Sequence, residues 1–224
     1  MGIIHMFKKL STLSKSYAKT TIAVFLVGFI ILYILFVIEE AVSEATRVQQ
    51  IPLLDNLDRS LAQAGSYSKL NIGKMSAFEF QKEPRMLPDI RFRNSAGKLI
   101  SLRGFSNKVI LLNIWATWCA PCLREMPHLN ELQSRLGSDT FEVVAVSLDA
   151  GSPEKPKKLL RKISVDALHF YHDPTAQLSF TLKALGMPTT LLIDNNGREI
   201  GRLVGAADWS STDASRLINA YLPN

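Results

Sequence analysis

Two cysteines, Cys119 and Cys122, offer the most reactive chemistry in the sequence, and the chain has no others. They stand three positions apart in the segment WCAPC. A disulfide between them would close a minimal loop and would restrain little of the unfolded chain, so it would be a poor structural crosslink. The spacing instead favours a redox pair that alternates between a dithiol and a disulfide.

The elements around this pair must place both sulfurs together. Residues 109–115 (VILLNIW) are a nearly continuous apolar run that predicts a strand buried on both faces. A helix is expected from Ala120 to about Leu136, interrupted or kinked at Pro127. Three-residue spacing at a helix start puts both sulfurs on one face, and the free N–H groups there stabilise a thiolate. We therefore predict that Cys119 attacks a disulfide and that Cys122 resolves the mixed disulfide.

The remaining pattern alternates strands and helices, which predicts an α/β fold with a mixed sheet in one domain, 87–224. Strands are expected at 141–147 and 167–171, and helices at 153–163, 175–185 and from Asp208 or Ser210 to about Tyr221. Two hairpins are expected, one joining 90–93 to 98–101 and one joining 189–193 to 198–204.

An apolar N-terminal run suggests a membrane anchor. Residues 22–38 carry no charge. As a helix, this run is long enough to cover most of a hydrocarbon core about 30 Å thick. We predict a basic cytoplasmic segment at 1–20, one transmembrane helix at 21–38 and a tether at 39–86. Lysines precede the run and glutamates follow it, so the domain should lie outside the cytoplasm. In a bacterium this means the inner membrane and the periplasm. A cleaved signal peptide and a partner-docking arm at 39–86 are the alternatives.

The net charge of +6 does not indicate nucleic-acid binding. Lys8, Lys9, Lys15 and Lys19 lie in the N-terminal segment, and removing these four from the 26 basic residues leaves 22 against 20 acidic ones. No basic stripe is left that could neutralise a phosphate backbone, so we expect no nucleic-acid partner.

The segment 115–127, WATWCAPCLREMP, resembles the active site of the TlpA family of thioredoxin-like proteins, which are membrane-tethered extracytoplasmic reductases. The resemblance runs from about Leu87 to Leu222 and includes VSLDAGSPEKPKKLL and GMPTTLLIDNNG. It implies a thioredoxin-like mixed sheet flanked by helices, with one transmembrane helix before it.

The resemblance also implies roles for particular residues. Pro188 would be preceded by a cis peptide bond, and Met187, Pro188 and Thr189 would contact the substrate. Trp118 and Pro121 would shape the same surface. Glu125 matches an acid near the active site of extracytoplasmic relatives, and a solvated helix residue is the alternative. Cytosolic thioredoxins place a buried aspartate where this chain has Asn113. Either no acid–base group serves the cysteines here, or Glu125 supplies it.

The resemblance favours reduction of cysteine pairs in copper-delivery or copper-binding proteins during cytochrome c oxidase assembly. Reduction of apocytochrome c is the alternative. In either case a membrane thiol donor would reduce the Cys119–Cys122 disulfide again after each cycle. No cofactor is needed, since the cysteines carry both electrons. A metal-binding copper chaperone is a further alternative, because His169 and His172 could join the cysteines as ligands. Their place beside a predicted strand favours surface roles, and we expect no metal site.

Overall fold

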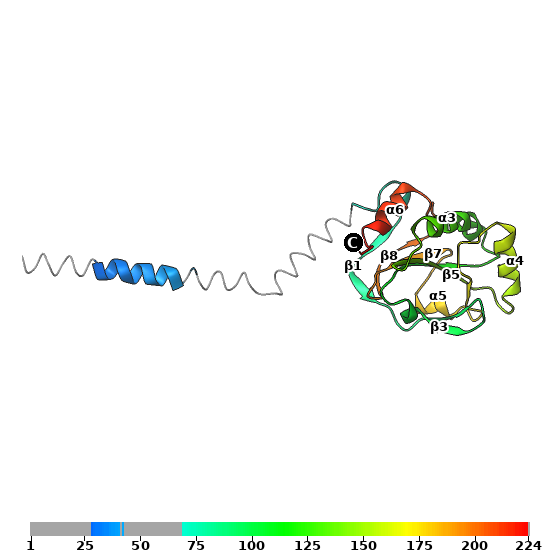
Figure 1. The fold of residues 1–224 in the computed structure, drawn as a ribbon, viewed down its shortest axis with the longest axis horizontal. Coiled ribbons are helices and arrows are strands. Elements are labelled where there is room, and N and C mark those ends of the chain that lie inside the picture. Colours follow the sequence, from blue (N-terminus) through cyan, green and yellow to red (C-terminus); the bar gives the residue numbers. More distant parts are fainter. Residues whose placement is uncertain (1–27, 41, 43–68, 224) are drawn as a thin grey trace, which may run out of the picture. The chain divides into compact units, whose positions relative to one another are not determined.

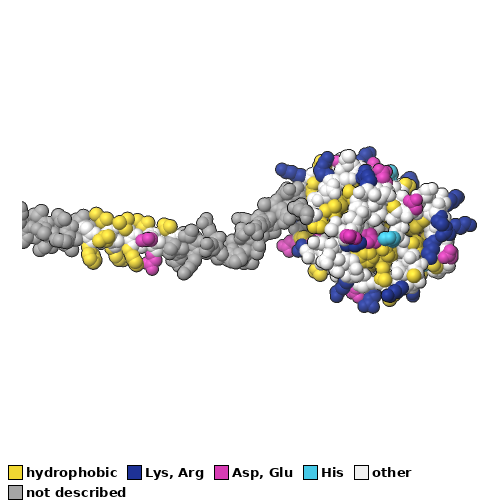
Figure 2. Space-filling view, in the orientation of Figure 1, with side chains coloured by type: hydrophobic (Ala, Val, Ile, Leu, Met, Phe, Trp, Pro, Cys, Tyr) yellow, Lys and Arg dark blue, Asp and Glu magenta, His cyan; other side chains and the backbone are white. Residues whose placement is uncertain are grey.

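The computed structural model describes residues 28–40, 42 and 69–223 of the 224-residue chain. Residues 28–40 form a helix whose large apolar side chains, from Phe29 to Ile38, are 44–76% exposed and make an almost continuous hydrophobic surface (Figure 2). None of the helices in the described ranges is long and apolar enough to cross a membrane. Residues 1–20, 21–27, 41 and 43–68, which include part of the predicted anchor and tether, lie outside the described residues.

A mixed sheet of eight strands organises residues 69–223 (Figure 1). The strand order is β1-β8-β7-β4-β5-β6-β2-β3. The pairs β4–β5 and β5–β6 are parallel and the others antiparallel. The strands are β1 (Glu79–Met86), β2 (Arg91–Asn94), β3 (Leu99–Ser101), β4 (Val109–Trp115), β5 (Phe141–Ser147), β6 (Tyr171–His172), β7 (Thr189–Ile193) and β8 (Arg198–Val204).

Helices cover both faces of this sheet (Figure 1). They are η1 (Gly73–Met75), η2 (Leu102–Phe105), α3 (Ala120–Leu136), α4 (Glu154–Lys162), α5 (Gln177–Thr181) and α6 (Thr212–Asn219). Because side chains alternate along a strand, Leu111 of β4 faces one core and Leu112 the other. The first core lies against α3, α4 and α6, and the second against α5 and η2. The predicted α/β mixed sheet flanked by helices is thus confirmed.

The central strands form where the apolar runs predict them, and β4, β5, β7 and β8 agree with the prediction at both ends. All residues of β4 and β5 are buried, as expected for strands in the middle of a two-faced sheet. Helix α3 passes through Pro127 without a break, although an interruption or kink was expected there. Pro127 is exposed, so its ring projects toward solvent.

The boundary predicted at 86/87 is wrong, because the folded domain begins earlier. Strand β1 pairs with β8, and Met75 and Phe78 are buried in the core beside α6. The sequence of β1, EFQKEPRM, has no regular apolar alternation and contains a proline. Both features suit an edge strand, where one side needs no backbone partner, and they hide the strand from pattern analysis.

Three C-terminal elements differ from the prediction. The strand expected at 167–171 is only Tyr171–His172, and the helix expected at 175–185 is Gln177–Thr181. The closing helix α6 is capped by Ser211, whose hydroxyl accepts the N–H of Ala214, and not by Asp208 or Ser210. Asp208 instead accepts a hydrogen bond from the Ser210 hydroxyl in the preceding turn.

Candidate active site

The two cysteines are joined by a disulfide at the start of α3, with their Cα atoms 5.3 Å apart. Cys119 is the N-cap residue of the helix, and its Sγ accepts a hydrogen bond from the backbone N–H of Cys122 at 3.3 Å. Cys119 is 6% exposed, whereas Cys122 is 0% exposed. The sulfur on the solvent side therefore belongs to Cys119.

The helix start supplies the electrostatics that a reactive cysteine needs. Unpaired N–H groups and the positive end of the helix dipole lie at Cys119, and the first turn contains no acidic residue that would oppose them. The Cys122 N–H that meets the sulfur in the disulfide can also meet a thiolate after reduction. Such surroundings lower the pKa of a cysteine thiol and raise the share of the nucleophilic form.

Asp149 anchors the loop that leads into the cysteines, and sequence reasoning missed it. Its carboxylate accepts hydrogen bonds from the backbone N–H of Thr117 at 2.9 Å, from the Thr117 hydroxyl, and from the Ser147 hydroxyl at 2.9 Å. Asp149 follows β5, the parallel neighbour of β4, so the ends of two adjacent strands hold the loop together. Its signal in the sequence is an aspartate two residues after the end of a buried strand.

Glu125 lies on α3, three residues after Cys122, and is 1% exposed. The solvated alternative is therefore wrong. Its Oε1 accepts a hydrogen bond from Asn113 Nδ2 at 2.7 Å, and its Oε2 accepts the backbone N–H of Ala207 at 3.1 Å. Burial raises the pKa of Glu125 to about 7, although these two hydrogen bonds lower it in part.

Asn113 connects Glu125 to the sheet. Its side-chain amide donates to Glu125 and also to the Thr190 hydroxyl at 2.9 Å, while its Oδ1 has no hydrogen-bond partner among the described residues. An amide cannot exchange a proton with Cys122, so at this position it only orients the carboxyl group. Glu125 itself is the titratable member of this hydrogen-bonded group.

The loop before β7 reaches the same end of the sheet as the cysteines. The Met187–Pro188 peptide bond is cis, as the resemblance predicted. Thr189 pairs with Ile114 near the end of β4, directly before the loop that carries Cys119. The Pro188 carbonyl accepts the Gly205 N–H at 2.8 Å, and the Thr189 hydroxyl donates to Gly186 O at 2.6 Å.

Exposed apolar side chains occur beside these two loops. Trp118, which directly precedes Cys119, is 66% exposed, and Pro121 is half-buried. Leu185 is 95% exposed next to the cis-proline loop, and Val204, the partner of Thr189 on β8, is 53% exposed. Trp115, in contrast, is fully buried.

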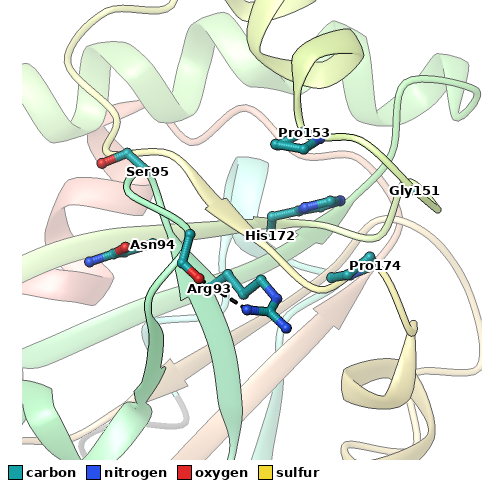
Figure 3. A pocket seen from close by; sticks show the side chains of 8 residues that line it. Arg93, Asn94, Ser95, Gly151, Pro153, His172 and Pro174 are labelled. Atoms are coloured by element: carbon teal, nitrogen blue, oxygen red, sulfur yellow. Dashed lines mark hydrogen bonds between the residues drawn. The ribbon is translucent and has the colours of Figure 1, made fainter.

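The two histidines of the metal alternative bind other groups. His172 is buried and its Nε2 donates to the Asp149 carbonyl at 2.6 Å, while His169 Nδ1 lies 3.1 Å from Glu142. His172 also lines a pocket of about 240 Å³ with Arg93 and Pro153, and neither cysteine lines it (Figure 3). In the part of the chain that the structure describes, no group of three or more His, Cys, Asp or Glu side chains is placed to hold a metal.

A redox-active disulfide at a strand-to-helix junction, in a mixed sheet covered by helices, defines a thioredoxin-like thiol–disulfide oxidoreductase. Comparison with known proteins agrees. The family model for Redoxin matches residues 81–218, and the chain belongs to this family.

Individual relatives point to the same class. Thiol-disulfide oxidoreductase ResA of Bacillus cereus is 32% identical over 131 residues, which cover 56% of this chain and 75% of the relative. Thioredoxin-like protein YneN of Bacillus subtilis is 32% identical over 139 residues, 59% of this chain and 73% of the relative. Among solved structures, the crystal structure of a putative thiol:disulfide interchange protein DsbE from Chlorobium tepidum superimposes with a TM-score of 0.56 and 29% sequence identity. The alignment covers 62% of this chain and 97% of that chain. The chain is therefore a thiol–disulfide oxidoreductase with the redox pair Cys119–Cys122, and its clients are proteins with cysteine pairs.

Proposed function

We propose that the chain is a membrane-anchored reductase that acts outside the cytoplasm. The thiolate of Cys119 attacks one sulfur of a client disulfide, and the client's other sulfur leaves as a thiolate that takes a proton from solvent. Cys122 then attacks Cys119, which releases the second client sulfur. The client gains two electrons and two protons, and Cys119 and Cys122 become the disulfide.

The observation that carries this proposal is the unequal placement of the two sulfurs. Cys119 stands at the N-cap with 6% exposure, whereas Cys122 is fully buried one turn along the helix. A client can approach the first sulfur, and only the partner cysteine can approach the second. This geometry supports Cys119 as the attacking residue and Cys122 as the resolving one.

Glu125 suits the role of proton acceptor for Cys122. Residues three apart on a helix are neighbours on its surface, and both of these are buried. A carboxyl group with a pKa of about 7 is divided between its two protonation states near neutral pH. It can therefore take the proton of the Cys122 thiol during resolution and return it when the disulfide is reduced again.

The client surface is proposed to consist of Trp118, Pro121 and the loop Met187, Pro188 and Thr189. Two loops contribute it, and the pairing of β7 with β4 keeps them at one end of the sheet. The exposed apolar area of Trp118 favours contact with a client backbone or apolar side chain.

The location and clients form a further part of the proposal. The exposed apolar side chains of the helix at 28–40 support an anchor over 21–38. The lysines before this run and the glutamates after it favour a catalytic domain outside the cytoplasm, which in a bacterium is the periplasm. We propose that the clients are cysteine pairs of copper-delivery or copper-binding proteins used in cytochrome c oxidase assembly. A membrane thiol protein would supply the electrons.

Trapping of the mixed disulfide tests the nucleophile and the client together. Cys122→Ser should remain bound through Cys119 to a peptide that carries an oxidised copper-site cysteine pair, and Cys119→Ser should not. A peptide with an oxidised haem-binding CxxCH motif is the matched competitor. Preferential capture of that peptide would show that the client is apocytochrome c. Capture by Cys119→Ser alone would refute the assigned order of attack.

The reduction potential of the Cys119–Cys122 pair tests the direction. Equilibration of the full chain in thiol buffers should give a value well below about −200 mV, toward the thioredoxin end of the known range. A value near about −120 mV would make the chain a disulfide donor.

A further inference from the structure

A pocket beside Glu125 connects the buried carboxyl group with the surface of the domain. The pocket has a volume of about 320 Å³, and Glu125, His128 and Asp208 are among the residues that line it. Glu125 is 1% exposed, whereas the His128 side chain is 41% exposed. A proton that leaves Glu125 for solvent thus has an imidazole next to its path.

Hydrogen bonds in this pocket determine which nitrogen of His128 carries the proton. The Ser210 hydroxyl donates its single hydrogen to Asp208 Oδ1 at 2.6 Å. Ser210 Oγ lies 3.0 Å from His128 Nδ1, so in this contact it must accept and Nδ1–H must donate. Asp208 Oδ1 lies 3.4 Å from the same nitrogen. Nε2 is consequently the nitrogen that is free to accept a proton.

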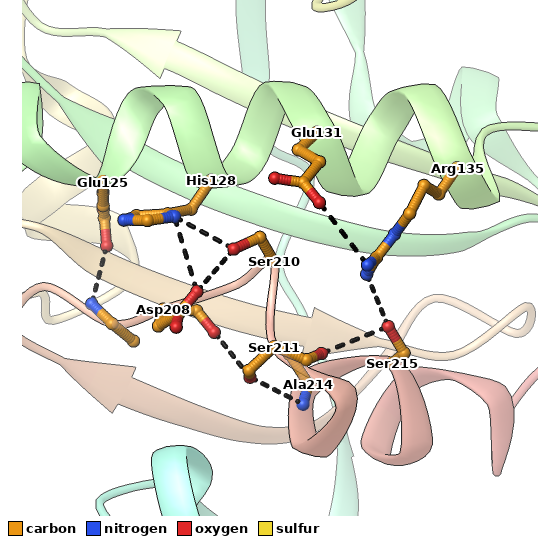
Figure 4. A network of polar contacts seen from close by, with 10 residues as sticks. Glu125, His128, Glu131, Arg135, Asp208, Ser210, Ser211, Ala214 and Ser215 are labelled. Carbon is orange, nitrogen blue, oxygen red and sulfur yellow. Dashed lines mark hydrogen bonds and ion pairs between the residues drawn. The ribbon is translucent and has the colours of Figure 1, made fainter.

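The free nitrogen is on the Glu125 side of the ring. Glu125 and His128 stand three residues apart on α3 and share one face of the helix. Figure 4 shows Nδ1 directed at Ser210 and Asp208, and the other ring nitrogen on the side of Glu125. Asp208 and Ser210 hold the ring through Nδ1, as the orienting group of an acid–base relay does, and Glu125 and His128 line one pocket that has room for water.

Charged groups from every packed element face His128. Asp208, from the turn before α6, and the basic residues Lys74 of η1 and Arg124 of α3 line the same pocket as His128. Glu131 lies one turn further along α3, where it pairs with Arg135 at 3.6 Å. The Ser210 hydrogen bond lowers the pKa of Asp208, and the charges of His128 and Lys74 lower it further. Asp208 therefore remains a carboxylate, which holds the Ser210 hydroxyl and the His128 ring in place.

We propose that His128 carries the proton between Glu125 and solvent in each redox cycle. This inference rests on the proposed role of Glu125. During resolution the Cys122 S–H proton moves to Glu125, the Cys122–Cys119 bond forms, and the bond between Cys119 and the client breaks with its electron pair on the client sulfur. The proton then moves from Glu125 to His128 Nε2 through water in the pocket that both residues line, and from there to buffer. His128 touches no reacting atom and acts only through Glu125.

The test follows the rate at which the reduced full chain resolves its mixed disulfide with a disulfide peptide, in weak buffer and by stopped flow. His128→Ala should slow this step by about tenfold, less than the roughly 10²-fold that loss of the acid–base group itself costs. Added imidazole should return the rate to near that of the unsubstituted chain. His169→Ala is the matched control, because His169 is 71% exposed and contacts Glu142 instead, and it should leave the rate unchanged.

Each outcome separates this relay from the role of Glu125. A normal rate for His128→Ala, or a slow rate that imidazole does not restore, overturns the relay, since a structural defect would not respond to a free base. Glu125→Gln should be slow, and His128→Ala added to it should cause no further loss. If Glu125→Gln reacts at the normal rate, the proposed role of Glu125 fails as well. If Glu125→Gln is slow and His128→Ala is not, only the relay fails.

Discussion

Glu125→Gln should remove a pH dependence from the stability of the oxidised protein. In the disulfide form the cysteines do not titrate, so the carboxyl group of Glu125 can be followed without them. Its pKa is about 7 in the folded protein because burial disfavours the carboxylate, against an ordinary value of 4.5 in the unfolded chain. Folded and unfolded chains therefore bind different numbers of protons between these two pH values.

The sign and size of the effect follow from this difference. Below pH 4.5 both states hold the proton, and the stabilisation from the raised pKa is fully present. As pH rises toward 7 the unfolded chain loses the proton first, so the free energy of unfolding falls. At about 1.4 kcal/mol for each pH unit, the interval from 4.5 to about 7 corresponds to about 3 kcal/mol.

Urea unfolding of the oxidised full chain and of Glu125→Gln, measured from pH 4 to pH 8, provides the assay. Glutamine has nearly the same shape as the protonated carboxyl group, so the variant should be compared with the unsubstituted chain at each pH. The stability of Glu125→Gln relative to the unsubstituted chain should rise by about 3 kcal/mol over this interval. A relative stability that stays constant with pH would show that Glu125 ionises normally, and the buried-acid account of the site would be wrong.

Two further predictions concern other parts of the domain. Glu199 is fully buried and binds Arg202 at 2.6 Å and Arg85 at 2.8 Å, so Glu199→Ala should lower the free energy of unfolding by about 3–5 kcal/mol because Arg202 is left without its buried partner. If urea unfolding shows a loss below about 1 kcal/mol, the pair contributes no more to stability than a surface ion pair does, and the prediction is wrong. Trp118 is 66% exposed, so Trp118→Ala should change stability by no more than about 0.5 kcal/mol and yet slow the reduction of a client peptide. Equal reduction rates in a stopped-flow comparison would remove Trp118 from the client surface.

Sequence patterns predicted the elements whose own residues indicate whether the element is buried or exposed. The apolar runs of β4 and β5 agree with the strands residue by residue, because a strand buried on both faces contains few polar residues. The polar exceptions are Asn113 of β4, which donates hydrogen bonds to Glu125 and Thr190, and Glu142 and Ser147 of β5, which bind Tyr171 and Asp149. Edge strand β1 escaped prediction, because an edge that is half exposed tolerates polar residues and proline.

The sequence by itself determined the reactive pair and its place at the start of a helix, since both follow from neighbouring residues. Only the tertiary structure decided what surrounds that pair. Glu125 meets the Ala207 N–H across 82 positions, Asp149 meets Thr117 across 32, and His128 meets Ser210 across 82. Such contacts depend on how α3 and the segment before α6 pack on the sheet, and that packing is set by the whole core and not by any local pattern.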